Sequence, residues 1–179
     1  MLFPRVAAAD DGRVTTTAHP PPPRARSALF LAGFVAGCLI VGALAGLSTV
    51  DGVRTWYRTI AKPAWTPPDG LFGPVWTVLY CAMGFAAWRV WRRGPSPEVS
   101  RALGRFASQL VLNVAWSPIF FALHRPGTAL VVIVVLDLAL VRTIGAFRRI
   151  DRFGALVLVP YLAWCLFATA LNAAIVGLA

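Results

Sequence analysis

The sequence has little of the material from which metal centres, disulfide frameworks and hydrolytic active sites are made. It contains three cysteines, one in each of three separate apolar runs, and two histidines. The cysteines form no CxxC pair or Cys/His cluster, so we expect buried thiols. His19 lies in a proline-rich stretch and His124 in a turn, and neither has a nucleophile at a plausible spacing. A glycine-rich phosphate loop is also absent, so the sequence predicts no metal site and no ordinary catalytic machinery.

Charge is scarce as well. Only 13% of the residues are charged and 58% are hydrophobic, with a mean hydropathy of +0.70. The 179 residues suffice for one domain, whose interior is too small to bury so much apolar surface in a soluble protein. The net charge of +10 does not predict nucleic-acid binding, because the arginines lie between apolar runs and no nucleic-acid motif occurs. These properties predict an integral membrane protein.

Five apolar runs predict an all-α bundle of five transmembrane helices, over residues 27–50, 73–91, 106–123, 128–147 and 153–179. Together they form one domain, 27–179, preceded by a disordered tail over 1–26. The first run is longer than the apolar part of a signal peptide, which favours a retained helix over a cleaved leader. Residues 51–72 form a long loop, and such loops are often functional.

The distribution of basic residues orients this bundle. Thirteen arginines lie in the tail and in the turns after the second and fourth helices, against four basic residues on the opposite side. By the positive-inside rule the N-terminus is cytoplasmic, whereas the first loop and the C-terminus face outward. The two glycine pairs of the first helix, 33/37 and 42/46, have the spacing that lets helix backbones approach closely, within the bundle or between subunits.

Three of the predicted helices carry a stripe that mixes aromatic with polar or small residues on one face. The stripes are Trp76, Tyr80, Met83 and Ala87; Gln109, Asn113, Trp116 and Phe120; and Tyr161, Trp164, Ala168 and Asn172. Helix packing through interfacial aromatics and interhelical hydrogen bonds is one interpretation. The other is a pocket in which aromatic faces stack on a planar ligand while indole, phenol and amide groups hold its edge.

Asp137 is the one acid well inside an apolar run. An intramembrane carboxylate is a functional candidate by default. A structural role, with the carboxyl neutral or paired with a polar side chain of the third predicted helix, is the favoured interpretation over proton or substrate coupling.

At these positions the chain resembles the TspO/MBR family, the tryptophan-rich sensory proteins and translocator proteins. The resemblance extends over about 27–179 and is carried by these segments: Trp56-Tyr57, Lys62-Pro63-Ala64-Trp65-Thr66-Pro67-Pro68, Phe72-Gly73-Pro74-Val75-Trp76, Leu79-Tyr80, Leu112-Asn113, Ala115-Trp116-Ser117-Pro118, Phe120-Phe121, Pro160-Tyr161, Trp164, Phe167-Ala168 and Leu171-Asn172. It implies a five-helix fold, often dimeric, in a bacterial-type cell membrane. It also implies a cavity capped by the first loop that binds tetrapyrroles such as protoporphyrin IX, with no required cofactor.

The stripes, the loop and the resemblance together indicate a set of ligand-binding candidates. They are Tyr57, Trp65, Trp76, Tyr80, Asn113, Trp116, Phe120, Tyr161, Trp164 and Ala168. Trp65 is also expected to anchor the entry of the loop into the second helix. The resemblance assigns Trp76 and Trp164 to the photochemical activity found in some members. The Tyr and Arg of the sterol-recognition pattern of some members are missing after Asn172, which argues against sterol binding at that place.

The leading hypothesis is a porphyrin-binding membrane sensor or receptor that regulates or sequesters porphyrins and related apolar ligands. Arg54, Arg58 and Lys62 of the first loop are expected to attract the ligand's propionates. One alternative is an enzyme that degrades porphyrin in light through Trp76 and Trp164. The other is a transporter of tetrapyrroles, lipids or sterols, for which Asp137 is the suggestive residue.

Overall fold

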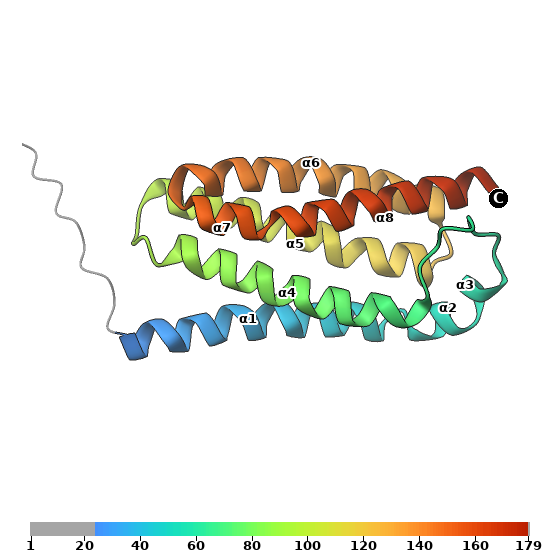
Figure 1. The fold of residues 1–179 in the computed structure, drawn as a ribbon, viewed down its shortest axis with the longest axis horizontal. Helices are drawn as coiled ribbons and strands as arrows, with labels where there is room; N and C mark the ends of the chain where they lie inside the picture. Colours follow the sequence, from blue (N-terminus) through green and yellow to red (C-terminus); the bar gives the residue numbers. More distant parts are fainter. Residues whose placement is uncertain (1–23, 179) are drawn as a thin grey trace, which may run out of the picture.

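The computed structural model describes residues 24–178, and over this range the chain forms helices and connecting turns without a β-strand. Long apolar segments satisfy their backbone hydrogen bonds internally when they are helical, as a bilayer requires. The long helices lie side by side, and the short helices α2 and α3 sit at one end together with the end of α8 (Figure 1). This end is called the loop end below.

Five long helices make up the bundle: α1 (Arg24–Leu47), α4 (Asp69–Trp91), α5 (Pro97–Phe121), α6 (Pro126–Ile150) and α8 (Val159–Leu178). Two short helices, α2 (Val50–Arg54) and α3 (Trp56–Thr59), lie within the predicted loop, and α7 (Arg152–Val157) precedes α8. Of the tail expected over residues 1–26, all but the last three residues lie outside the described part. Those three begin α1.

All five long helices differ from the predicted bounds, and two of them differ most. α5 begins at Pro97 rather than at residue 106, because the Ser96 side chain accepts a hydrogen bond from the Val99 N–H and Pro97 occupies the first turn. The predicted helix 153–179 is divided at Leu158 into α7 and α8. Pro160 has no N–H to donate to the Leu156 carbonyl, and its ring crowds that carbonyl, so the helix is interrupted between them.

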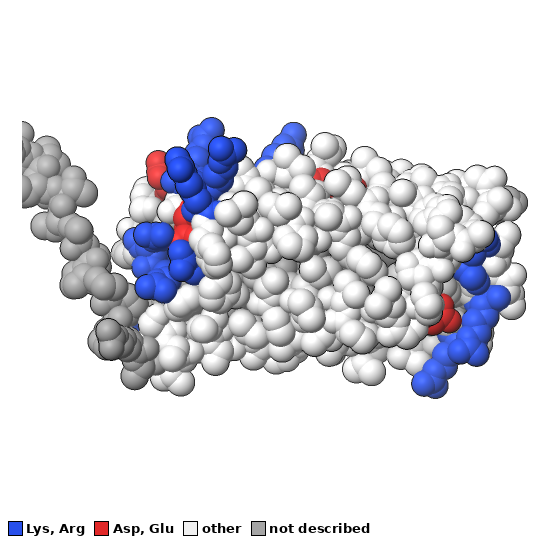
Figure 2. Space-filling model, in the orientation of Figure 1, with Lys and Arg blue, Asp and Glu red and all other residues white. Residues whose placement is uncertain are grey.

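Within residues 24–178, four segments are long and apolar enough to cross a membrane: 26–47, 69–91, 126–150 and 152–178, the last made of α7 and α8. α5 is not among them; Glu98, Arg101 and Arg105 occupy its first turns, and the polar Gln109 and Asn113 lie in the apolar stretch that follows. Lys and Arg gather at the two ends of the molecule and leave an almost uncharged band between them (Figure 2). This distribution is that of an integral membrane protein.

The packing of α1 against α4 changes along their length. A Cβ atom at Gly84 would lie 2.6 Å from the Val35 Cα and 2.7 Å from the Phe34 carbonyl oxygen, so the two backbones touch there. One turn nearer the loop end, the Tyr80 ring fills the space over Gly42. A Cβ atom added at Gly33, Gly37 or Gly46 would meet no neighbour within 4 Å in the described chain. The backbone contact thus depends on Gly84 of α4, and of the predicted glycine pairs Gly42 alone meets a neighbour in the described chain, the Tyr80 ring.

The opposite end, called the arginine end below, is held together by Asp151 between α6 and α7. Its carboxylate accepts hydrogen bonds from Arg89 at 2.9 Å, from Arg93 and from the Gly154 N–H at the start of α7. Burial alone would raise the pKa of Asp151, but the Gly154 amide and the two guanidinium groups lower it below its ordinary value. Asp151 therefore joins α4 to the α6–α7 junction.

Candidate functional site: a cavity beneath the first loop

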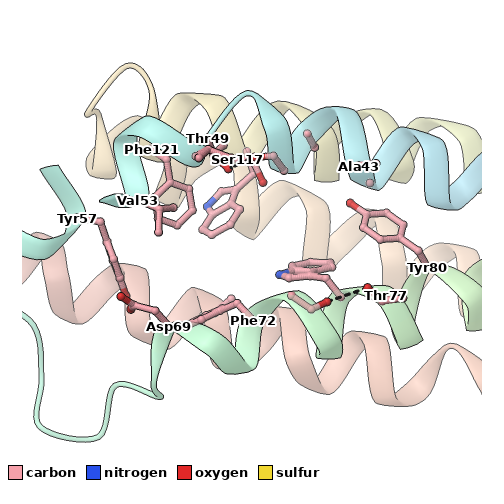
Figure 3. A pocket seen from close by; sticks show the side chains of 18 of the residues that line it. Ala43, Thr49, Val53, Tyr57, Asp69, Phe72, Thr77, Tyr80, Ser117 and Phe121 are labelled. Carbon is pink, nitrogen blue, oxygen red and sulfur yellow. Dashed lines mark hydrogen bonds between the residues drawn. The ribbon is translucent and has the colours of Figure 1, made fainter. Parts of the chain in front are cut away.

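A cavity of about 660 Å³ lies at the loop end of the bundle. Residues of α1 through α5 and of α8 line it, and α1 and α4 form its long sides. Figure 3 shows Tyr57 and Asp69 at one end of the cavity and Tyr80 at the other. Ligand pockets of drug-sized molecules range from about 300 to 1,000 Å³. The cavity is therefore large enough for a ligand of that class.

Aromatic rings form most of its walls. Trp76 lies on α4 with its ring centroid 5.6 Å from that of Tyr80, and Phe72 of α4 packs edge-on against Trp164 of α8 at 5.9 Å. Trp116 of α5 adds a third indole. Such rings offer wide flat faces for stacking at a small cost in conformational entropy. The walls suit a planar, largely apolar ligand.

The first loop closes the mouth of the cavity through Tyr57 of α3. Its side chain is buried against Phe120 and Phe121 of α5. The ammonium group of Lys62 donates to the Tyr57 carbonyl oxygen and lies 4.6 Å from the centroid of the Tyr57 ring. Burial, together with the nearby Asp69, raises the pKa of the Tyr57 hydroxyl to about 12. Tyr57 thus stays neutral at physiological pH.

The inner wall of the cavity is backed by a chain of buried hydrogen bonds. The Tyr80 hydroxyl donates to Asn113 Oδ1 at 2.6 Å, and Asn113 Nδ2 donates to the Tyr161 hydroxyl oxygen at 2.9 Å. The Tyr161 hydroxyl donates in turn to Gln109 Oε1 at 3.0 Å. These bonds tie α4, α5 and α8 together behind the cavity.

The remaining polar groups around the cavity are few. Arg54 and Asp69 lie at the mouth, and the hydroxyls of Thr49 and Thr77 donate to the carbonyls of their own helices. The Trp164 indole N–H is buried and has no hydrogen-bond partner among the described residues. No group of three or more His, Cys, Asp or Glu in the described chain is arranged to hold a metal ion. The arrangement favours binding over acid–base chemistry.

Comparison with known proteins identifies the family. Residues 34–178 match the model of the TspO/MBR family. The chain belongs to the TspO/MBR family. It is 42% identical over 154 residues to the tryptophan-rich protein TspO of Chlorobaculum tepidum, which covers 84% of this chain and 96% of that protein. It is 40% identical over 145 residues to the tryptophan-rich sensory protein of Cereibacter sphaeroides, covering 81% and 87%. It is 41% identical over 124 residues to the human translocator protein, covering 68% and 73%.

The structure of this TspO/MBR chain divides the predicted site residues into two groups. Six of them line the cavity: Tyr57, Trp76, Tyr80, Trp116, Trp164 and Ala168. Four lie outside its lining: Trp65, Asn113, Phe120 and Tyr161. Trp65 is half exposed and packs edge-on against Phe167 of α8. Phe120 stacks behind Trp116, and Asn113 and Tyr161 belong to the buried hydrogen-bond chain.

Several lining residues of this TspO/MBR cavity were not among the predicted candidates. They are chiefly the small residues on one face of α1, such as Gly42, Ala43 and Gly46, with Thr49 beyond them. The signal was present in the glycine spacing, which was interpreted as a packing motif. Asp137 does not line the cavity. Its Oδ2 accepts a hydrogen bond from Thr169 at 2.7 Å.

Proposed function

We propose that this chain is a membrane receptor that binds a porphyrin in the cavity beneath its first loop. The proposal rests on the size and the lining of the cavity. Its volume is about 660 Å³, and it has Trp76 on one side and Trp164 on another. A macrocycle inserted between them presents two faces to aromatic rings, and Tyr57 closes over its edge. The names of the relatives, which include a sensory protein and a translocator protein, agree with a receptor in the membrane.

Arg54 is the basic residue placed to meet a propionate. It lines the mouth of the cavity, whereas neither Arg58 nor Lys62 does. Lys62 is already engaged with Tyr57. Of the three cations considered from the sequence, Arg54 is therefore the one we assign to the ligand. Its contribution depends on how far the bound ligand removes it from water.

Titration with protoporphyrin IX tests this function. We expect saturable quenching of tryptophan fluorescence by the purified protein, in detergent and in lipid vesicles. Trp164→Phe should weaken binding several-fold because it removes an indole face. The control Trp91→Phe should not, because Trp91 stacks on Phe30 away from the cavity. Failure to saturate in both media would reject the proposed function.

Light-dependent porphyrin breakdown is a second candidate function, because both indoles assigned to that activity, Trp76 and Trp164, line the cavity. The measurement is the bleaching rate of bound protoporphyrin under illumination, compared at equal occupancy. We expect the Trp76→Phe, Trp164→Phe double variant to bleach it much more slowly than the unaltered protein. Equal rates would exclude this role for the two indoles.

We infer that all five long helices cross the membrane, with α7 and α8 acting as one crossing. α5 is 25 residues long and packs between α4 and α6, although its first turns carry charge. The excess of arginine on one side then places the N-terminus in the cytoplasm of a bacterial-type cell and the loop end outside. A homodimer is the expected assembly, which cross-linking in native membranes would test.

A further inference from the structure

The direction of the hydrogen bonds behind the cavity determines whether the cavity presents a hydrogen-bond donor or an acceptor to a ligand. Tyr80 and Asn113 are 6% and 3% exposed, and Tyr161 and Gln109 are fully buried. In such surroundings each polar group depends on its protein partner, because water does not replace it. The structure gives the chain one direction of donation, and Gln109 Nε2 at its inner end has no partner among the described residues.

The donors run from the cavity inward. A tyrosine hydroxyl has one proton, and the proton of Tyr80 is directed to Asn113 Oδ1. Asn113 presents its oxygen to Tyr80 because its Nδ2 group donates to Tyr161, whose own proton goes to Gln109. Tyr80 lines the cavity and has only the lone pairs of its oxygen left to offer there.

We propose that Tyr80 is a specificity-determining residue, a hydrogen-bond acceptor that favours planar apolar ligands carrying an N–H or O–H donor. Asn113 acts as a positioning residue by holding the Tyr80 proton away from the cavity. The inference rests on the proposed function only in taking the cavity as the ligand site. Trp164 also lines the cavity, and its indole N–H is buried without a partner among the described residues.

Three flat tricyclic probes of nearly equal size test this selection. Carbazole has one N–H donor, fluorene has neither donor nor acceptor, and fluorenone has one carbonyl acceptor. The unaltered protein should bind carbazole about 2- to 10-fold more tightly than fluorene, the ratio expected for one added hydrogen bond. Binding is measured by tryptophan quenching in detergent. Tyr80→Phe gives the reference ratio, since it removes the acceptor and keeps the ring.

A second variant separates positioning from packing. In Asn113→Leu the Tyr80 proton loses its acceptor and becomes available to the cavity. The affinity for fluorenone relative to fluorene should then rise above its value in the unaltered protein, while the carbazole advantage shrinks. A merely structural role of Asn113 would lower all three affinities together.

The outcomes separate this inference from the function on which it rests. Equal binding of carbazole and fluorene by the unaltered protein would overturn the selection by Tyr80 and leave the cavity as a binding site. A carbazole advantage that persists undiminished in Tyr80→Phe would do the same. Absence of saturable binding for all three probes would overturn both the selection and the use of this cavity for planar ligands.

Discussion

Midway along α1, at Gly84 and Val35, α1 and α4 touch backbone to backbone, whereas at the loop end the same two helices line a cavity. The residues that α4 turns toward α1 explain the change. Gly84, Tyr80 and Trp76 are spaced by four and lie on one face of the helix. The side chain on that face is a hydrogen atom at Gly84, a phenol at Tyr80 and an indole at Trp76, so the space between the two helices increases toward the loop end. One helix face thus forms both a tight contact and the wall of a binding site.

The two ends of the bundle also differ in the kind of contact that joins their helices. The arginine end is fixed by a buried carboxylate with two guanidinium partners, Asp151 with Arg89 and Arg93. The loop end is closed by rings: Tyr57 packs on Phe120 and Phe121. Ring contacts lack the strict geometry of hydrogen-bonded ion pairs, so a lid built from them can open for a ligand at lower cost. The ion pairs that stabilise the fold and the ring contacts that close the cavity therefore lie at opposite ends of the bundle.

Gly84→Ala should lower the free energy of unfolding more than the other substitutions proposed below. The added Cβ would lie 2.6 Å from the Val35 Cα, so α1 has to move away from α4. We expect a loss of about 3 kcal/mol in the free energy of unfolding, the upper range for overpacking. The measurement is thermal unfolding in detergent.

The control is Gly104→Ala on α5, where a Cβ meets nothing within 4 Å. This variant should be as stable as the unaltered protein or up to about 1 kcal/mol more stable, because alanine favours the helix. Equal stabilities of the two alanine variants would contradict the close contact at Gly84.

Asp151→Asn should have the next effect, a loss of about 2 kcal/mol at neutral pH, because it removes hydrogen bonds between charged groups. The contribution of Arg93 is the smaller one, since its side chain is 51% exposed against 25% for Arg89. The pKa of Asp151 is lowered in the folded state. Its stabilisation is therefore present above the ordinary aspartate pKa of about 3.9 and is lost as the pH falls below that value.

The pH dependence distinguishes this effect from general damage. Unfolding of the unaltered protein should become easier as the pH falls below about 3.9, and Asp151→Asn should lack that part of the pH dependence. Glu98→Gln is a suitable control, because Glu98 is exposed and forms no salt bridge in the described chain. An acid response in Asp151→Asn as large as in the unaltered protein would rule out this role.

Much of the helical architecture could be predicted from the sequence because apolar length and arginine placement are local properties. The start of α5 at Pro97 lies in a charged stretch ahead of the apolar run and depends on the Ser96 cap. The break at Leu158 lies inside an apolar run and depends on Pro160. A hydropathy profile alone does not include helix capping or the effect of a proline. The boundaries of these two helices differ from the predicted ones for that reason.

The helix faces that form the site could be predicted from the sequence, whereas the position of each side chain relative to the cavity could not. Helical periodicity places Tyr80, Asn113 and Tyr161 toward a common interior, but it does not tell which side chain reaches the cavity and which supports it from behind. The hydrogen bond between Tyr80 and Asn113 decides that question, and it joins residues 33 positions apart. The role of a glycine such as Gly42 likewise depends on the side chain that faces it.

Gly46→Leu should have the smallest effect on stability and a clear effect on binding. Gly46 lines the cavity, and a Cβ there meets nothing within 4 Å, so a leucine enters free space. We expect the free energy of unfolding to change by less than about 1 kcal/mol. The affinity for protoporphyrin IX should fall about 10-fold or more, because the side chain takes volume from the ligand and filling one face prevents stacking.

Gly37→Leu is the matched control on the same helix. Gly37 also has open space around its Cβ position but does not line the cavity. Both leucines add the same apolar surface to α1, so a difference in porphyrin affinity between them reports the cavity alone. Equal losses of affinity would mean that the exposed face of α1 matters rather than the space beneath the loop. An unchanged affinity in both variants would place the porphyrin elsewhere on the protein.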